Sequence, residues 1–450
     1  MRKKIDAEIF KGYDIRGLYP SQIDKDSIFK IGQAFSFYSK AKKIAVGQDI
    51  RLSSSELSDS FIKGVLASGA DVVDIGLSST PQLYFAVSCY GYDAGAIITA
   101  SHLEKEYNGL KFVLKNSIPL DKEQIITFRD LVLNQDFKAA KEQGRLEKKN
   151  IDTDYIKALK NFVKTPLKSL KVVFDSGNAM TGPLIKRVFE NLGLDSVYLF
   201  TELDGHFPNH ETNPKIDQNR KALEEKILEE KADLGFMFDG DGDRVYVLDN
   251  KGKVIDPSFV SALIAEYLVA NFQEKKVAIE IRTSNVVKDM VEAQGGKVER
   301  VKPWHVMIKF AMRKDPEIIF GSETSGHYIF KNFYYIDSGI LTSIIFLQAI
   351  SFYKESLSQI LANLRNKYFI IPETNFPDKD GEIIFKKLEN YYKEKKGKIN
   401  FIDGISIDFP CWRFNLRKSE TEPLLRLNLE ANSRKLMEEK KDEVSRLILE

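Results

Sequence analysis

The sequence has 450 residues, enough for about three average domains, and its 67 basic and 65 acidic side chains leave a formal net charge of +2. With 43% hydrophobic and 29% charged residues, the composition is that of an ordinary globular protein. It excludes a disordered chain and a protein with a broad basic face for nucleic acid. Two cysteines cannot form a disulfide framework or a four-cysteine zinc site.

No segment of the sequence is expected to direct export or to enter a membrane. Asp6 and Glu8 interrupt the basic N-terminus before any apolar run begins. The most apolar stretch, 339–353, has about fifteen residues including Ser, Thr and Gln. That is short of the ~20 apolar residues needed to span a bilayer. We therefore expect a buried helix there, and a cytoplasmic location for a protein with unpaired cysteines.

Three segments share the pattern of a strand–helix–strand unit. Each opens with a lysine followed by a β-branched run, continues through a helical stretch to a glycine, and closes with a second strand-like run. The three segments are 43–76, 171–200 and 276–301. Their repetition predicts three related α/β domains.

The C-terminal part of the sequence has a different pattern. From about residue 368 it is polar and rich in lysine, and 386–398 predicts a solvent-exposed helix. Strand-like runs follow, and a final amphipathic helix is expected to place Met437, Val444, Leu447 and Ile448 on one face. We predict a smaller α+β domain here. The expected domains are 1–147, 148–254, 255–367 and 368–450.

Polar residues that follow the strand-like runs are candidate site residues, because ligands collect at the carboxyl ends of strands in open α/β sheets. The first such loop follows the apolar run 94–99 and contains Ser101 and His102, with Lys111 further on. Ser101 could be a nucleophile or a phosphoryl carrier, with His102 or Lys111 handling protons and charge. The alternative is a serine that caps the N-terminus of a helix.

The second loop carries the most specific local signal. Asp239, Asp241 and Asp243 alternate with glycines between two strand-like runs. Three carboxylates this close would repel one another without a cation, and hard divalent cations prefer oxygen ligands. A calcium EF-hand is excluded because Arg244 and Asn250 stand at its glycine and glutamate positions. Mg²⁺ serving phosphate chemistry fits better, and a polar turn is the alternative.

The third loop, between glycines, offers Glu323, Ser325 and His327 after a strand-like run. No lysine follows Gly326, so this is not a Walker P-loop. A carboxylate beside a hydroxyl suits the hydroxyls of a sugar. The alternative is an ordinary surface turn.

The fourth loop groups Arg417, Ser419 and Thr421 between two strand-like runs of the C-terminal domain. The planar fork of an arginine, together with hydroxyls and loop amides, can hold a phosphate. The alternative is a charged hairpin. The four loops together offer a carrier serine, a metal site, a sugar site and a phosphate site. This combination indicates a function far more specifically than any one loop does.

Seven motifs carry a resemblance to a known family. They are FKGYDIRG (10–17), VGQDIRLSS (46–54), TASH…YNGLK (99–111), DGHFPNH (204–210), DGDGDR (239–244), SETSGH (322–327) and RKSETEP (417–423). With them the sequence resembles the α-D-phosphohexomutase superfamily over nearly its whole length, and within it the bacterial phosphomannomutase/phosphoglucomutase enzymes. The resemblance implies four α/β domains around a central cleft, the first three related mixed α/β sandwich-like units and the fourth a smaller α+β domain.

The resemblance also implies an activity. It implies an isomerase of carbohydrate metabolism that interconverts the 1-phosphate and 6-phosphate of glucose or mannose. Ser101 would become a phosphoserine, and Mg²⁺ would be held by that phosphate together with Asp239, Asp241 and Asp243. A hexose 1,6-bisphosphate would be the intermediate, turning around in the cleft before its other phosphate returns to Ser101.

By matching position, the resemblance implies roles for further residues. Near the reacting phosphate it places Tyr13, Arg16, Lys111 and Arg244. The candidates for proton transfer are Lys111 and His305. Glu323 and Ser325 would hold the sugar hydroxyls, and the phosphate that is not transferring would contact Arg417, Ser419 and Thr421. Tyr13, His102 and His327 are the other expected substrate-binding residues. Hexose phosphates are the expected partners, with no nucleic acid, membrane or obligate protein partner.

The sequence departs from the usual family pattern at several positions. Leu103 and Glu104 replace the usual Asn-Pro after the serine loop, Trp304 replaces a glycine before His305, and Glu420 replaces an asparagine. The alternatives are a phosphoglucosamine mutase, whose opening usually reads FGTDGVRG, or a non-catalytic sugar-phosphate-binding relative. A magnesium phosphatase would need the pattern DxDxT, in which Asp243 stands in place of the threonine.

Overall fold

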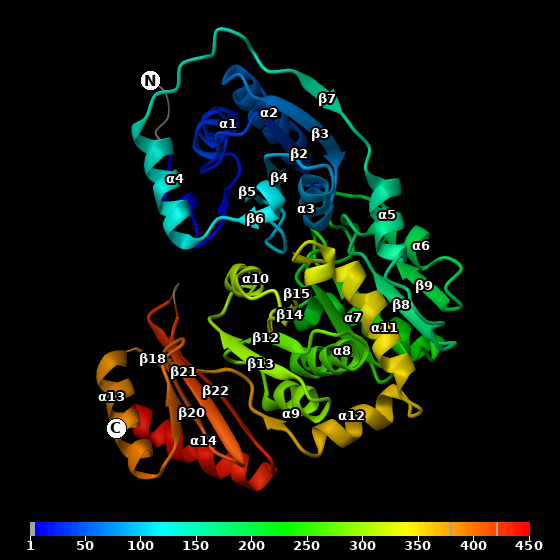
Figure 1. Ribbon diagram of the computed structural model, residues 1–450, viewed down its shortest axis with the longest axis vertical. Coiled ribbons are helices and arrows are strands. Elements are labelled where there is room, and N and C mark those ends of the chain that lie inside the picture. Colours follow the sequence, from blue (N-terminus) through cyan, green and yellow to red (C-terminus); the bar gives the residue numbers. More distant parts are fainter. Residues whose placement is uncertain (1–4, 379, 420–421) are drawn as a thin grey trace. The chain divides into compact units, whose positions relative to one another are not determined.

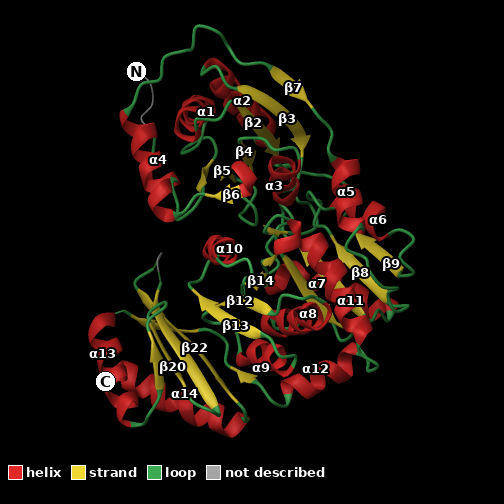
Figure 2. Ribbon diagram, in the orientation of Figure 1, coloured by secondary structure: helices red, strands yellow, loops and turns green. Residues whose placement is uncertain are grey.

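The computed structural model describes residues 5–378, 380–419 and 422–450 (Figure 1). The chain divides into two compact units. Unit 1 consists of Met1–Ile255 and Ser325–Ser351, and unit 2 of Asp256–Thr324 and Phe352–Glu450. Helices and strands alternate along most of the chain in both units (Figure 2). This alternation is what the strand–helix–strand pattern in the sequence predicts.

The first sheet of unit 1 has a parallel centre. Its strands lie in the order β1 (Ile15–Leu18), β5 (Tyr107–Leu114), β4 (Ala94–Ile98), β2 (Lys43–Gln48), β3 (Asp71–Leu77) and β7 (Leu146–Lys148), and β6 (Ile118–Pro119) also pairs with β5. Strand β2 is parallel to β3 and to β4, whereas β4 and β5 are antiparallel.

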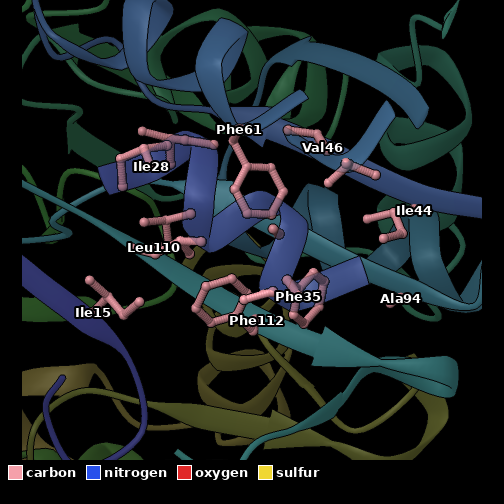
Figure 3. Packing of buried hydrophobic residues seen from close by; sticks show 14 of the residues in the cluster. Ile15, Ile28, Phe35, Ile44, Val46, Phe61, Ala94, Leu110 and Phe112 are labelled. Atoms are coloured by element: carbon pink, nitrogen blue, oxygen red, sulfur yellow. The ribbon is translucent and has the colours of Figure 1, made fainter. Parts of the chain in front are cut away.

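Helices cover both faces of this sheet. On one face, α1 (Lys25–Ser39), α2 (Ser54–Ala67) and α4 (Lys122–Asn134) share a core with alternate residues of β2, β4 and β5. Phe35, Phe61 and Phe112 pack together in that core (Figure 3). On the other face, α3 (Thr80–Cys89) lies so close to β4 that a side chain at Gly95 would meet Val87. The strand period of two therefore decides which side chains meet which helices.

The second sheet of unit 1 is smaller. Its order is β11 (Val245–Asp249), β10 (Leu234–Phe238), β8 (Lys171–Asp175) and β9 (Asp195–Leu199). The other helices before residue 255 are α5 (Asp152–Lys160), α6 (Gly182–Phe189) and α7 (Asp217–Glu230). Unit 1 also contains the antiparallel pair β15 (Tyr328–Phe330) and β16 (Ile336–Asp337), and α11 (Gly339–Phe352) up to residue 351. Its short 3-10 helices are Ala7–Ile9, Lys115–Ser117 and Lys331–Phe333.

Unit 2 contains two sheet regions. The first has the parallel order β13 (Lys297–Val301), β12 (Lys276–Glu280) and β14 (Ile318–Ser322). Its helices are α8 (Pro257–Asn271), α9 (Asn285–Ala293), α10 (His305–Lys314) and α12 (Leu357–Arg365). The second is the antiparallel sheet β17 (Phe369–Ile370), β22 (Leu424–Ala431), β21 (Trp412–Lys418), β20 (Ile405–Asp408) and β19 (Lys398–Asn400), with β18 (Thr374–Pro377) also on β22. Helices α13 (Gly381–Glu394) and α14 (Arg434–Leu449) pack against it.

The predicted internal repeat is confirmed. The three parallel orders β3-β2-β4, β9-β8-β10 and β13-β12-β14 are the same arrangement built three times. In each repeat, the first strand in the sequence lies in the middle, the second strand on one side of it and the third strand on the other. The C-terminal segment is an antiparallel sheet with two helices, so the predicted α/β fold class with a smaller α+β part is also confirmed.

Each repeat turns from its helix into its second strand at a glycine. Gly69, Gly193 and Gly295 have φ values of +86°, +79° and +74°. This left-handed region is costly for residues with a Cβ atom and free for glycine, which is why glycine ends so many helices. The glycine in the sequence pattern therefore reports a real backbone requirement.

The structure changes one expectation for the C-terminal segment. The lysine-rich stretch 386–398 was predicted to be a solvent-exposed helix, but α13 starts earlier and buries Phe385, Leu388 and Tyr392. The prediction is wrong because the many lysines on the outer face hide an apolar stripe with helical spacing. The predicted face of the last helix is confirmed, since Val444 and Ile448 are buried in the same core.

The apolar stretch 339–353 is confirmed as a buried helix, α11, whose residues 339–350 are all buried. Within the part of the chain that the structure describes, no helix is both long enough and apolar enough to cross a membrane.

The turn after α6 gives a test of the backbone requirement. We expect Gly193→Ala to lower the free energy of unfolding by about 1 kcal/mol, because alanine is strained in the left-handed region. A Cβ atom there would meet no atom within 4 Å, so steric overlap adds nothing. Urea unfolding measures the loss. Gly193→Asn is the matched control and should cost less, because asparagine tolerates this backbone; equal losses would contradict the interpretation.

Candidate functional site

Two of the predicted loops follow equivalent strands of the repeat. The loop with Ser101 follows β4, and the loop with Asp239, Asp241 and Asp243 follows β10. Each of these strands is the third strand of its strand–helix–strand repeat, so both loops leave the carboxyl end of a sheet at the same position. The two loops are in contact within unit 1, because the Ser101 hydroxyl donates a 3.0 Å hydrogen bond to Asp239 Oδ2.

The three aspartates form a fully buried acidic cluster. None of them has solvent exposure, and their carboxylate oxygens lie within 4.8 Å of one another. Asp241 Oδ1 and Asp243 Oδ1 accept no hydrogen bond from the described residues. Buried carboxylate oxygens are almost always bonded or bound to a cation, and these two are available as ligands. The cluster therefore fits a metal ion.

Charge compensation in the cluster is incomplete without a further cation. Lys111 Nζ on β5 lies 2.6 Å from both Asp241 Oδ2 and Asp243 Oδ2. Burial opposes the lysine charge, but the two carboxylates outweigh it and raise the pKa of Lys111 well above its ordinary value. Burial and the charges of Asp243 and Asp241 together raise the pKa of Asp239 well above its ordinary range. An ion bound here would relieve that cost.

Ser101 sits in a strained turn. Its φ of +54° is left-handed, an unfavourable conformation for a residue with a side chain. No helix follows it, because the chain continues as a turn into β5, so the helix-cap alternative is wrong. Ser101 Oγ also lies 3.2 Å from His102 Nδ1. Burial, with the nearby charges of Arg244 and Arg16, lowers the pKa of His102 well below its ordinary value, so the imidazole is neutral at pH 7.

Arg244 is held by a chain of polar contacts. Its backbone N–H donates to Asp239 Oδ1 at 3.1 Å, and its Nε donates to His327 Nε2 at 2.9 Å. His327 Nδ1 lies 2.9 Å from Asp337 Oδ2, so this nitrogen carries the ring proton. Within unit 1, His327 thus orients Arg244, a contact that the sequence analysis did not predict.

The opening motif contributes Arg16 and Tyr13 to the same cluster. Arg16 is on β1, and its Nε donates to Asp14 Oδ2 at 2.8 Å. Burial opposes its charge, but Asp14 and Tyr13 raise the pKa of Arg16, with a smaller contribution from Asp241. The predicted residues Tyr13, Arg16, Ser101, His102, Lys111 and Arg244 are therefore brought together around the acidic cluster in unit 1.

Unit 2 holds a second group of predicted residues. Glu323 follows β14 and is 6% exposed, with Arg282 Nη2 3.6 Å from its Oε1. Arg282 Nε in turn donates to Glu280 Oε2 at 2.7 Å. Thr324 also bonds Glu280, through both its amide and its hydroxyl. Ser325, on the same loop, belongs to unit 1, and its hydroxyl is buried without a partner among the described residues.

Two arginines near each other favour an anion in unit 2. Burial and the neighbouring charge of Arg282 lower the pKa of Arg417, while Asp403, 3.8 Å away, compensates only in part. A phosphate between such guanidinium groups would remove the repulsion. Ser419 lies in the hairpin after β21, where its amide donates to the Leu424 carbonyl at 2.7 Å. Thr421 and Glu420 lie outside the described residues.

His305 is the first residue of α10 and is buried. The preceding Trp304 has a φ of +87°, in the left-handed region that favours glycine. This explains the glycine usual at this position in the resembling sequences. It also shows that the chain keeps the turn despite the tryptophan.

Four polar residues at these sites were missed in the sequence: Thr80, Glu280, Arg282 and Asp337. Thr80 Oγ1 donates to Asp241 Oδ2 at 2.6 Å. A signal for Glu280 and Arg282 was available, because Glu-Ile-Arg (280–282) repeats the Asp-Ile-Arg of 14–16 and 49–51. Thr80 and Asp337 are brought in by the tertiary fold, and nothing near them in the sequence marks them.

Four sequence models of the phosphoglucomutase/phosphomannomutase family match this chain in order. The alpha/beta/alpha domains I, II and III match residues 7–139, 153–252 and 256–368. The C-terminal domain of the family matches residues 373–447.

Whole proteins show the same similarity. The chain is 34% identical to a phosphomannomutase of Vibrio cholerae, covering 98% of each chain. It is 35% identical to a phosphomannomutase of Methanocaldococcus jannaschii, again covering 98% of each. A crystal structure of a phosphoglucomutase/phosphomannomutase family protein from Burkholderia thailandensis matches with a TM-score of 0.90 at 30% identity, over 99% of this chain and 97% of that one.

The acidic cluster predicts stabilisation by divalent cations. We expect millimolar MgCl₂ to raise the melting temperature, because binding to the folded state alone shifts the unfolding equilibrium. Asp241→Asn should abolish most of that shift, since it removes one of the buried carboxylate charges. Thermal unfolding with and without the salt measures the effect. Asp59→Asn, at an exposed position of α2 in the same unit, is the control and should keep the full shift in melting temperature. If Asp59→Asn also lost the shift, the stabilisation would come from non-specific ion binding.

Proposed function

Because this chain belongs to the phosphoglucomutase/phosphomannomutase family and is a phosphohexomutase, an isomerase, we propose that it interconverts the 1-phosphates and 6-phosphates of glucose or mannose. Ser101 is the proposed phosphoryl carrier, and a hexose 1,6-bisphosphate is the proposed intermediate. The observation that carries the proposal is the Ser101 hydroxyl, held 3.0 Å from the buried cluster of three aspartates.

The proposed metal is Mg²⁺, with Asp239, Asp241, Asp243 and a phosphate oxygen on Ser101 as ligands. Oxygen-only donors with three negative charges suit this hard cation. When bound, Mg²⁺ offsets negative charge on the phosphoryl group and on the carboxylates. Arg244 and Arg16, both turned toward the acidic cluster by partners of their own, add fixed positive charge for the transferring group.

The proton transfers are proposed for Lys111 and His305. Lys111 is held protonated by Asp241 and Asp243, so in this state it supplies positive charge and could take part in proton transfer only as a donor, not as a base. His305, buried at the start of α10, is the proposed partner for the sugar hydroxyl. His102 is neutral and beside Ser101, and we propose that it contacts substrate.

Unit 2 supplies the proposed grip on the part of the substrate that does not react. Glu323, with Ser325 of the same loop, is proposed to accept and donate hydrogen bonds to sugar hydroxyls. Arg417, Ser419 and Thr421 are proposed to hold the phosphate that is not transferring. The repulsion between Arg282 and Arg417 supports an anion at this place.

Several broader expectations are also part of the proposal. The four proposed domains keep the bounds 1–147, 148–254, 255–367 and 368–450. A cytoplasmic location is proposed on the basis of the two free cysteines, Cys89 and Cys411. Hexose phosphates are the proposed partners, and no nucleic acid, membrane or obligate protein partner is proposed.

The phosphoryl relay has a direct test. Incubation with glucose 1,6-bisphosphate and MgCl₂ should add one phosphoryl group to the protein, seen by intact-mass spectrometry, because Ser101 is the only proposed acceptor. Ser101→Ala should take up none. Ser88→Ala, a serine of α3 that bonds Ser117, is the control and should be labelled like the wild type. An unlabelled wild type would rule out the relay and favour the non-catalytic alternative.

The choice of sugar is tested by comparing substrates. We expect conversion of both glucose 1-phosphate and mannose 1-phosphate in a coupled mutase assay, with glucosamine 1-phosphate slower than at least one of them. The three sugars differ only at C2. A kcat/KM for the amino sugar more than about tenfold above the others, or about 1.4 kcal/mol of discrimination, would favour the phosphoglucosamine alternative. Steady release of phosphate without isomerisation would instead favour a phosphatase.

A further inference from the structure

Two sequence motifs have no part in the chemistry proposed so far. VGQDIRLSS (46–54) and DGHFPNH (204–210) supply no ligand, proton or phosphate contact. In unit 1 they meet at the loop that carries Ser101, and the residue that joins them is Arg51. Its side chain is buried, with 2% exposure.

Arg51 donates hydrogen bonds to four backbone carbonyls of the serine loop. Its Nη2 donates to the carbonyls of Ser101 at 3.0 Å and Leu103 at 2.6 Å. Its Nη1 donates to the carbonyls of Glu104 at 2.6 Å and Tyr107 at 3.0 Å. One planar guanidinium therefore fixes four carbonyl groups spread over seven residues.

The Asp49 carboxylate in turn fixes the position of the guanidinium group. Arg51 Nε lies 3.3 Å from Asp49 Oδ2, and the other oxygen of that carboxylate accepts from the Arg51 amide at 3.0 Å. The Asp49 carboxylate also accepts from the Ser54 hydroxyl. All of these groups are buried, so the orientation of the fork does not depend on flexible surface contacts.

The second motif covers the open face of the guanidinium. The Phe207 ring lies 5.5 Å from Arg51 Cζ, within the range of a cation–π contact. Gly205 lets this segment approach, because a Cβ atom there would lie 2.3 Å from the carbonyl oxygen of Ile50. Thr212, two residues past the motif, donates from its hydroxyl to the Ser101 carbonyl at 3.3 Å.

This support acts on a strained residue. Ser101 has a φ of +54°, and such a conformation persists only where surrounding contacts over-determine it. Its amide donates to Thr99 Oγ1 at 2.9 Å, and its carbonyl accepts from Arg51 and Thr212. The backbone on both sides of the Ser101 Cα atom is thereby locked, which aims the hydroxyl at Asp239.

We propose that Arg51 is a positioning residue for phosphoryl transfer: by bonding the carbonyls of the serine loop it holds Ser101 in the strained geometry that places its hydroxyl at the acidic cluster. The inference rests on the proposed role of Ser101 as carrier. Arg51 touches no reacting atom and acts only through the loop.

The same acid–x–arginine pair recurs elsewhere with a different use. In 14–16 and 280–282 an acidic residue also contacts the Nε of the arginine two positions later, and Asp14 contacts Arg16 Nη2 as well. Arg16 interacts electrostatically with Asp241, and Arg282 reaches Glu323. At 49–51 both terminal nitrogens donate to backbone carbonyls, so this copy supports a loop, whereas the other two interact with charged side chains.

The test separates positioning from folding and from binding. Arg51→Met should slow single-turnover phosphorylation of Ser101 by glucose 1,6-bisphosphate by about 10²-fold, the usual cost of misplacing a reacting group by about an ångström. Affinity for the sugar bisphosphate should change less than about twofold. Amide hydrogen exchange should rise in residues 102–108 and not across the whole protein. Arg220→Met is the matched control: Arg220 is also buried in unit 1 and bonds the Pro214 carbonyl, but its polar partners Pro214, Asp217 and Glu224 lie outside the serine loop.

If Arg51→Met does not fold, Arg51→Lys tests whether Arg51 positions the serine loop. Lysine keeps the charge but cannot present a planar fork to four carbonyls, so phosphorylation should be about tenfold slower. If folded Arg51→Lys is phosphorylated at the wild-type rate and residues 102–108 exchange as in the wild type, the inference is wrong. If the wild type takes up no phosphoryl group, the proposed relay is wrong, and the hydrogen-exchange comparison alone then decides whether Arg51 holds the loop.

Discussion

Repulsion among three buried carboxylates governs the arrangement of unit 1. Asp239, Asp241 and Asp243 carry their charges without solvent, and burial makes each charge costly unless it is paired. Lys111 compensates two of them, and Asp239 keeps a strongly raised pKa. A bound cation would relieve the remainder, and the proposed phosphoserine would need such a cation too. The site is therefore a set of groups that are stable only together, which places Ser101 and its loop under tight geometric control.

That control comes from the repeated sheet. The third strand of each α/β unit ends where a functional loop begins, so one backbone arrangement supplies the serine loop after β4, the acidic loop after β10 and the loop of Glu323 after β14. An acidic residue at or just after the end of the first strand of each repeat binds nearby backbone. Asp49, Asp175 and Glu280 each accept a hydrogen bond from the amide two positions later. Repetition thus provides both the loops and their supports.

Local patterns in the sequence predicted much of this. The three strand–helix–strand units, the glycines that turn into their second strands, the buried helix α11 and the acidic loop are all encoded by neighbours in the chain. The α13 helix was misjudged because lysines mask its apolar stripe. The contact of His327 with Arg244 was not predicted, because it joins two residues that are 83 positions apart in the sequence.

The sequence by itself determined the fold class and the family, because these depend on short motifs and on periodicity. The same motifs marked Ser101, the three aspartates, Lys111 and Arg244 as candidate site residues. Only the tertiary structure decided which of them meet: that Lys111 lies between two aspartates, that His327 and Asp337 orient Arg244, and that Arg51 grips the serine loop. The net charge of +2 likewise conceals one buried acidic cluster and the cations around it. Such contacts join residues far apart in the chain, and burial, which sets their energies, exists only in the folded state.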